Sequence, residues 1–432
     1  MFNKLAPLIL AAFLLFSIIV PHTVSQKDVR NWNNVSYWSM NPRGVPPAWY
    51  GELRGLPKTE WLTGRYEDGK FVYTYDFHYY HAPQDILLIP NQTKSLRLIM
   101  IDPDGNRYVL WEGYIPDFVY IGKTIPNLMS IARKKCNPVP HPGTLMLHGP
   151  LNVLFVKNGR PCVNPSRKDF LQGKYTFIVE GTFGNLTKND EPKIKVLGLS
   201  YGLMGTDIDG RDVWVGFAYG AKETVLVAFI GGAVMILLAL LLGSLSVLSG
   251  KVGRAVNFIS KFLTSTPALP VAVILILLTG NVVSIPGQYW YFTINPFILG
   301  AIVGILLMGN VSRNIKAIIE EELRKEHIES AKALGGNSKW ILKKHVAPIL
   351  MPYSLHQFAL AVPGIIAFIT LLGFFNVSAG VNWGSIMGGI IIRGANYRLS
   401  WWQVVPIGIA LGLLAFSFLS IANEIEKRFL KG

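Results

Sequence analysis

Long apolar runs alternate with charged connections through the second half of the chain, and one further apolar run lies near the N-terminus. About 20 apolar residues cross the hydrocarbon core of a bilayer, and a spanning backbone must satisfy its own hydrogen bonds. Each run therefore predicts a transmembrane helix. The expected spans are residues 5–20, 224–248, 267–283, 295–310, 355–375 and 404–422.

The first run allows two interpretations. It fits a secretory signal peptide, with Thr23-Val24-Ser25 as a weak cleavage site, and it fits a retained span. Both interpretations send the residues that follow it outward. We favour the retained span and assign residues 1–25 to a first transmembrane helix.

Residues 26–200 have no long apolar run and are rich in Pro, Gly, Tyr and Trp. Short segments in which apolar and polar residues alternate predict strands, and Asp102-Pro103-Asp104-Gly105 has the composition of a turn. This spacing favours a β-sandwich inserted between the first and second spans. The expected strands are residues 71–77, 96–101, 108–111, 152–156 and 175–179.

Positive charge is distributed unevenly among the connections. The net charge is +15, and Lys and Arg are concentrated in 249–262, in 311–353 and in the C-terminal tail. The positive-inside rule therefore places these segments and both termini in the cytoplasm, and residues 26–222 outside. The chain is expected to be a multi-pass protein of the cell membrane in contact with lipid. The basic residues form no compact run with interleaved aromatics, so nucleic acid is not an expected partner.

An outside location has two consequences for residues 26–200. A disulfide between Cys136 and Cys162 is permitted there, although two unpaired thiols remain the alternative. N-glycosylation triplets begin at Asn34, Asn91 and Asn185, but such triplets also arise by chance.

The connection 311–353 predicts a helical hairpin. Residues 320–334 contain no Gly or Pro and predict one helix, which Gly335-Gly336-Asn337 should end through a positive φ at Gly335. Ser338 is expected to cap a second helix, and Pro348 with Pro352 is expected to end it. A rigid hairpin connected at both ends to transmembrane helices can be bound and moved by a soluble partner.

Two segments resemble one family of transport proteins. Residues 327–335 followed by 343–348 resemble the Glu-Ala-Ala…Gly loop of binding-protein-dependent ABC permeases, with Ser330 replacing the usual Ala. Residues 205–213 resemble the Gly-Thr-Asp-x-x-Gly-Arg-Asp-Val segment of the C-type subunit of dipeptide, oligopeptide and nickel importers. Thr206 and Asp209 there suggest a capping box. A weaker match lies at 371–374 and 383–387.

The resemblance implies a type I importer permease, mainly α-helical, whose core is residues 201–432. It implies a homologous second permease, two ATP-binding subunits that hold ATP and Mg, and an extracellular solute-binding protein. It does not cover residues 26 to about 195. The residues expected to couple to the ATP-binding subunit are Glu329, Ser330, Ala331, Ala333, Leu334, Gly335, His345 and Pro348. The expected outer-face motif is Gly205, Thr206, Asp207, Gly210, Arg211 and Asp212.

Several functions remain open or are excluded. Peptides are the favoured cargo and oligosaccharides the alternative, because no residue of the spans identifies a substrate. A membrane-anchored adhesion protein and a secondary transporter are the rivals from other classes, although spans with almost no charge argue against ion coupling. No phosphate-binding loop or catalytic grouping appears, so the chain is not expected to be an enzyme. No metal site is expected either, because His78 and His81 lack a third ligand nearby.

Overall fold

The computed structural model describes residues 2–91, 94–247, 250–284, 290–375, 377–378, 380–392 and 400–430. The chain forms two compact units. One comprises Met1–Asn34 together with Val215–Gly432, and the other comprises Val35–Trp214. The predicted boundaries at 26–200 and 201–432 therefore shift, because the segment 205–212 folds with the second unit.

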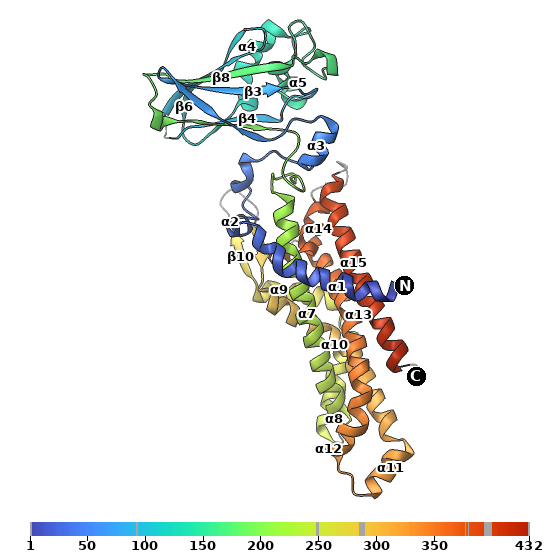
Figure 1. Ribbon diagram of the computed structural model, residues 1–432. Coiled ribbons are helices and arrows are strands. Elements are labelled where there is room, and N and C mark those ends of the chain that lie inside the picture. Colours follow the sequence, from blue (N-terminus) through green and yellow to red (C-terminus); the bar gives the residue numbers. More distant parts are fainter. Residues whose placement is uncertain are drawn as a thin grey trace. The chain divides into compact units, whose positions relative to one another are not determined.

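Strands of the unit 35–214 form two antiparallel sheets (Figure 1). One sheet has the order β2-β3-β8-β5-β6 and the other has the order β1-β9-β4-β7. Both contribute side chains to one hydrophobic core, which is the arrangement of a sandwich. The strands are β1 (Glu60–Leu62), β2 (Gly64–Glu67), β3 (Lys70–Phe77), β4 (Asp85–Ile89), β5 (Lys94–Ile101), β6 (Arg107–Ile115), β7 (Val119–Tyr120), β8 (Gly173–Gly181) and β9 (Lys193–Leu197).

Alternation correctly predicted the strands β3, β5, β6 and β8, since one face of each packs into the core. The turn at 102–105 is also confirmed, with Gly105 at a φ of +86°. The strand predicted at 152–156 is wrong, because Asn152–Phe155 is the helix α6. Val153, Leu154 and Phe155 are all buried, and a short uninterrupted apolar run does not distinguish a buried helix from a strand.

Short helices complete this unit: α3 (Ala48–Arg54), α4 (Ile125–Lys135) and α5 (Pro142–Leu147), with 3₁₀ turns at Tyr37–Met40, Ile121–Lys123, Arg167–Asp169 and Lys188–Asp190. Cys136 follows α4 directly and is joined to Cys162 by a disulfide, with a Cα–Cα distance of 5.6 Å. The pairing expected from the sequence is thus present. Of the three Asn residues that begin glycosylation triplets, Asn91 and Asn185 are exposed and Asn34 is half-buried.

The other unit is helical, and α13 and α15 pack side by side in it while α1 contacts α15 (Figure 1). Its helices are α1 (Phe2–Ile19, continued by Val20–Thr23), α2 (Gln26–Arg30), α7 (Val213–Ser246), α8 (Lys251–Ser265), α9 (Ala268–Thr279), α10 (Pro296–Leu323), α11 (Glu326–Ala333), α12 (Ser338–Ile341), α13 (Ala347–Phe374), α14 (Trp383–Ile392) and α15 (Trp401–Ile425). The helix α7 begins two residues before the unit boundary. Leu342–Val346 and Glu426–Leu430 are π-helical.

The described residues contain five helical segments long and apolar enough to cross a membrane, or up to six if α8 and α9 count as one span. These two helices meet at an angle of 99°. The connection predicted at 249–262 is therefore largely helix α8. The span predicted at 267–283 is cut short, because α9 ends at Thr279 and Asn281–Ser284 is the strand β10.

A small sheet was missed by the sequence analysis. The strand β11 (Trp290–Thr293) pairs antiparallel with β10 and parallel with β12 (Val377–Ser378). Strands this short leave no recognisable alternation.

Small residues bring α7 and α10 into close contact. A Cβ atom on Gly304 would lie 2.5 Å from the carbonyl oxygen of Gly231, and one on Gly300 would lie 3.0 Å from Val227 O. Glycines allow backbones to approach in this way in membrane helix pairs, where burial against lipid supplies little driving force. On α8, Ser260 Oγ accepts a hydrogen bond from Ser312 Oγ at 3.0 Å.

Candidate coupling site

The segment between α10 and α13 forms a helical hairpin, although its elements differ from the prediction. The helix predicted at 320–334 is divided, since α10 ends at Leu323 and α11 begins at Glu326. The prolines do not end the second helix. Pro348 lies in the first turn of α13 and Pro352 lies inside it, so the helical path continues from Ser338 to Gly373. The wider π-helical turn before Pro348 leaves this path unbroken.

Gly335 ends α11 with a φ of +87°, as the sequence predicted. Its N–H donates to Lys332 O at 3.0 Å, and the N–H of Gly336 donates to Ala331 O at 2.9 Å. These two bonds form a Schellman motif, in which a left-handed residue closes the end of a helix. A Cβ atom on Gly335 would meet nothing within 4 Å, so the backbone conformation alone makes this position select glycine.

The next helix is capped by Asn337 and not by Ser338. The Asn337 side chain accepts a hydrogen bond from Trp340 N at 2.9 Å and so satisfies a free donor of the first turn. A Cβ atom on Gly336 would lie 2.7 Å from Ala331 O, so this second glycine is required by close packing. The turn between the two helices is thus fixed by Gly335, Gly336 and Asn337, each for a different reason.

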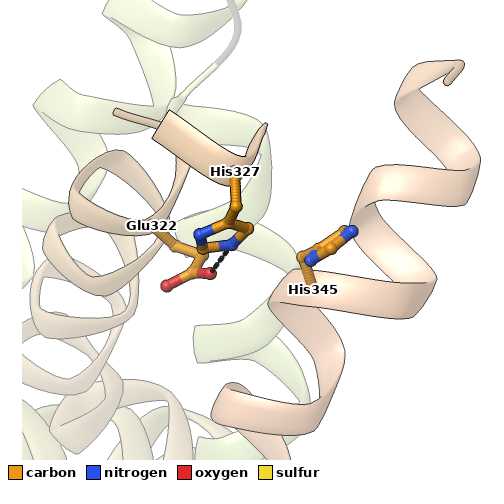
Figure 2. Close-up of side chains that lie close together, drawn as sticks. All are labelled: Glu322, His327 and His345. Carbon is orange, nitrogen blue, oxygen red and sulfur yellow. Dashed lines mark hydrogen bonds and ion pairs between the residues drawn. The ribbon is translucent and has the colours of Figure 1, made fainter. Parts of the chain in front are cut away.

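One face of the hairpin is anchored. Ile328 and Ile341 are 0% and 3% exposed, and Val346 is also buried. At the end of α10, the buried carboxylate of Glu322 accepts from Lys325 Nζ at 2.6 Å and lies 3.0 Å from His327 Nε2. Figure 2 shows Glu322 and His327 facing each other. Glu322 therefore connects α10 to the start of α11 across the break between them.

His345, expected at the coupling surface, is half-buried and lies on a separate helical segment next to His327 (Figure 2). Its ring lies 5.1 Å from the ring of His327 and 5.3 Å from that of Trp340. Its buried Nε2 has no hydrogen-bond partner among the described residues. Glu322, His327 and His345 offer ligand atoms within 4.8 Å of one another, but a cation there would compete with the ammonium of Lys325 for Glu322. We therefore assign these side chains to holding the hairpin in place.

The opposite face is open. Leu334 is 91% exposed and stands at the tip of the hairpin beside Gly335. An exposed leucine on a segment with several exposed lysines suits a protein partner with a small apolar hollow and acidic groups. The other exposed coupling residues are Glu329, Ser330, Ala333, Gly335 and Pro348, whereas Ala331 is half-buried. The exposed cations of this segment are Arg324, Lys325, Lys332, Lys339, Lys343 and Lys344.

Glu322 was missed by the sequence analysis. It lies in a row of three glutamates, Glu320 to Glu322, and the signal that distinguishes it is helical spacing, because it follows Ile315 and Ile319 on the buried face of α10. Glu320 and Glu321 are half-buried and exposed, respectively.

The second family-like segment is a structured turn in the unit 35–214. Asp207 Oδ1 accepts from the N–H groups of Asp209 and Arg211, both at 2.9 Å, and its Oδ2 binds Arg211 Nε at 2.5 Å. The capping box predicted for Thr206 and Asp209 is wrong. Thr206 Oγ1 accepts instead from Val45 N at 3.2 Å.

The turn ends where α7 begins, and Asp212 Oδ1 caps that helix by accepting from Trp214 N at 2.9 Å. Gly205 and Gly210 have φ values of +73° and +83°. The buried pair of Asp207 and Arg211 satisfies the backbone of the turn from inside. The structure thus gives this motif a local structural role.

Comparison with known proteins identifies the second half of the chain. Residues 235–431 match the model of the family described as binding-protein-dependent transport system inner membrane component. This range contains the whole hairpin and its anchor. Residues 235–431 therefore form a domain of this family, the membrane component of binding-protein-dependent transport systems.

Curated relatives of the chain are named as permease proteins of peptide transport systems. The oligopeptide transport system permease protein OppC of Haemophilus influenzae is 25% identical over 229 residues, covering 52% of this chain and 69% of the relative. The peptide transport system permease protein SapC of Escherichia coli O6:H1 is 28% identical over 233 residues, covering 53% and 73%. The probable D,D-dipeptide transport system permease protein DdpC of Escherichia coli K12 is 25% identical over 219 residues, covering 50% and 68%.

A solved structure of the MetNI methionine ABC transporter is also similar, with 19% identity and a TM-score of 0.38, and the match covers 49% of this chain and 96% of that one. The family match begins at residue 235, so it leaves the β-rich unit of the permease outside.

Proposed function

We propose that this permease forms part of the pathway of an ATP-driven importer of short peptides. The observation that carries the proposal is the two-faced hairpin: one face is anchored through Ile328, Ile341 and Glu322, and the other exposes Leu334. A segment that is packed on one face and accessible to a partner on the other can transmit movement from that partner to the spans. The peptide cargo is supported by relatives named as oligopeptide and peptide permeases.

In the proposed topology the hairpin faces the cytoplasm. Its exposed lysines and those of the neighbouring connections follow the positive-inside rule. Two ATP-binding subunits would dock there and would hold ATP and Mg. This chain itself has no phosphate-binding loop, so hydrolysis is assigned to those partners and not to the permease.

The mechanism proposed is alternating access driven by movement of the hairpin. ATP binding would close the two nucleotide subunits and shift the hairpin, and the shift would reach α10 through Glu322 and α13 through the continuous helix from Ser338. Coupling of this kind requires an element whose position both ATP and substrate bias. A second, homologous permease would complete the pathway.

The β-rich unit is assigned to the outside of the cell, where its disulfide would persist. We propose that it contributes to the surface on which a solute-binding protein delivers the cargo. Its separate core supports this role, because the unit has a hydrophobic interior of its own and does not depend on the spans for one.

The test is purification of the complex from native membranes, followed by reconstitution in vesicles. We expect a second permease and two ATP-binding subunits to accompany the chain, and peptide uptake to require ATP. Uptake that continues without ATP would indicate a secondary transporter, and isolation of the chain alone would favour an adhesion role. Uptake of oligosaccharides in place of peptides would refute the cargo while leaving the permease function standing.

A further inference from the structure

The chain crosses from one sheet of the sandwich to the other at Thr63, and the crossing opens the edge of a strand. Strand β1 pairs with β9 in one sheet, and β2 pairs with β3 in the other. The β2–β3 pairing extends only from Glu67↔Lys70 to Gly64↔Tyr73. Beyond Gly64 the chain leaves β3, which itself continues to Phe77. Gly64 permits this departure, because a Cβ atom there would lie 2.7 Å from the ring of Tyr73.

The remainder of β3 therefore has a partner on one side only. Residues 70–77 of β3 all pair with β8, whereas no described strand pairs with residues 74–77 on the other side. In an antiparallel ladder, alternate residues direct their backbone groups to alternate neighbours. The tight hairpin places Lys70 and Val72 toward β2, so by the same alternation Thr74 and Asp76 present their N–H and C=O groups to the vacant side.

A cleft lies along this edge. It has a volume of about 500 Å³, within the range of roughly 300–1,000 Å³ typical of small-ligand sites. One wall is the β1–β2 segment with Trp61, and the other is the open end of β3 continuing to Tyr79. Its charged side chains are of both signs: Glu60 and Asp76 are carboxylates, and Arg65 is a guanidinium.

A buried polar atom adds an independent sign of an unfilled site. Tyr75 lines the cleft and is 1% exposed, yet its hydroxyl has no hydrogen-bond partner among the described residues. Burial, with smaller contributions from Tyr79 and Glu60, raises the pKa of this hydroxyl well above its usual value, so it is a neutral donor. A buried hydroxyl without a partner is costly, so the polar groups on this side of the cleft are incompletely satisfied.

We propose that this cleft binds a short peptide in extended conformation, added as a further strand beside residues 74–77 of β3. Peptides bind open sheet edges through their main chain, and side-chain pockets then add selectivity. At about 3.3 Å per residue, the open edge accommodates roughly three to five residues. A free peptide carries an amino group and a carboxylate, which matches the carboxylates and the guanidinium of the cleft. A neutral oligosaccharide matches neither the charges nor the strand edge.

The test uses the full-length protein in detergent and the pentapeptide Val-Thr-Val-Thr-Val with free termini. Two further probes are the same peptide with N-methyl groups at every internal residue, and maltopentaose. We expect saturable binding of the unmodified peptide by calorimetry, with slower hydrogen exchange at the amides of Thr74 and Asp76. Equal binding of the N-methylated peptide, unchanged exchange at these two amides, or binding of maltopentaose alone would each overturn the proposal.

A matched pair of variants isolates the strand edge. Thr74→Pro removes the backbone donor, and proline is tolerated at an edge whose N–H faces no strand. Thr74→Val removes only the hydroxyl. We expect T74P to bind the peptide about tenfold or more weakly than T74V does, because the lost main-chain bond is specific to the proline variant. Equal affinities of the two variants would contradict strand addition.

If T74P fails to fold, the hydrogen exchange of the Thr74 and Asp76 amides in the unaltered protein still tests the proposal. Because binding is measured without transport, failure here leaves the permease function untouched.

Discussion

The N–H of Gly336 donates a hydrogen bond to the carbonyl of Ala331 at 2.9 Å, and this contact closes the end of α11. It forms only because Gly335, between them, adopts a φ of +87°. The hairpin tip, with Leu334 exposed beside it, is thus positioned by a backbone conformation that other L-residues rarely adopt. A small change of sequence at the tip should therefore alter function without disturbing the spans.

We expect Gly335→Val to impair ATP-driven uptake while the chain still inserts into the membrane. A left-handed conformation costs an L-residue about 1–2 kcal/mol, and a β-branched side chain adds to that cost. The Schellman motif should open and Leu334 should lose its position. Uptake per permease molecule in vesicles is the measurement, with Gly335→Asn as the control, since asparagine tolerates this conformation better. Normal uptake by the valine variant would count against the hairpin as a lever.

Glu322→Gln should loosen the anchor of the hairpin. Glutamine keeps a hydrogen-bonding group but removes the charge that holds Lys325 and faces His327. Since Lys325 is about half exposed, solvent screening keeps the expected loss of stability small. Faster cleavage by trypsin at Arg324 and Lys325 is the direct measurement, and weaker coupling of ATP hydrolysis to uptake should accompany it.

The control for this variant is Glu321→Gln, which neutralises an exposed glutamate one position away. The same rate of cleavage in both variants would show that Glu322 does not fix the hairpin.

Leu334→Asp is expected to weaken binding of the ATP-binding subunit. The side chain is 91% exposed in the isolated chain, so the substitution costs the fold little, whereas a charge at an apolar contact is costly. Co-purification of the two chains should fall about tenfold or more. Leu53→Asp makes the same change at a 78% exposed position of the β-rich unit and should leave co-purification unchanged. Full recovery of the partner with L334D would exclude Leu334 from the contact.

The local patterns that predicted parts of this fold correctly are those with a direct physical cause. Alternation predicted β3 and β8 because one face of each is buried, and glycine composition predicted the left-handed turn at Gly335. The pairing of Cys136 with Cys162 followed from their shared location and is present in the structure. The strands and the turn depend on interactions within one segment of the chain. The two cysteines allow only one pairing.

The features that were missed depend on residues distant in sequence. Thr206 was expected to cap a helix, but a contact with Val45 holds it in a turn. The bend between α8 and α9 and the sheet that β12 joins are likewise set by packing of separate segments. Glu322 is a different case, because its helical spacing from the buried Ile315 and Ile319 does distinguish it from its two neighbours. A single sequence contains the propensities of these segments but not the contacts that override them.

The β-rich unit should show a characteristic dependence of stability on pH because of Asp85. Burial raises the pKa of this carboxyl to about 6, although it accepts hydrogen bonds from the N–H groups of Gly122 at 2.8 Å and Ile86 at 2.7 Å. Between about pH 4 and pH 6 the folded state therefore holds a proton that the unfolded chain has released. The unfolding free energy contributed by Asp85 accordingly falls as pH rises through this interval, and is constant above it.

Asp85→Asn should remove this part of the slope, because the amide oxygen still accepts from Gly122 and Ile86 but no longer titrates. The measurement is urea unfolding of the full chain in detergent, followed by the β-sheet band of the infrared spectrum. The unfolding free energy of the unaltered protein minus that of D85N should decline between about pH 4 and pH 6 and then level off. Asp117→Asn, at an exposed position, serves as the control and should give no such difference. A flat difference for D85N would mean that the Asp85 carboxyl is ionised throughout this range, and that its bonds with Gly122 and Ile86 outweigh the effect of burial.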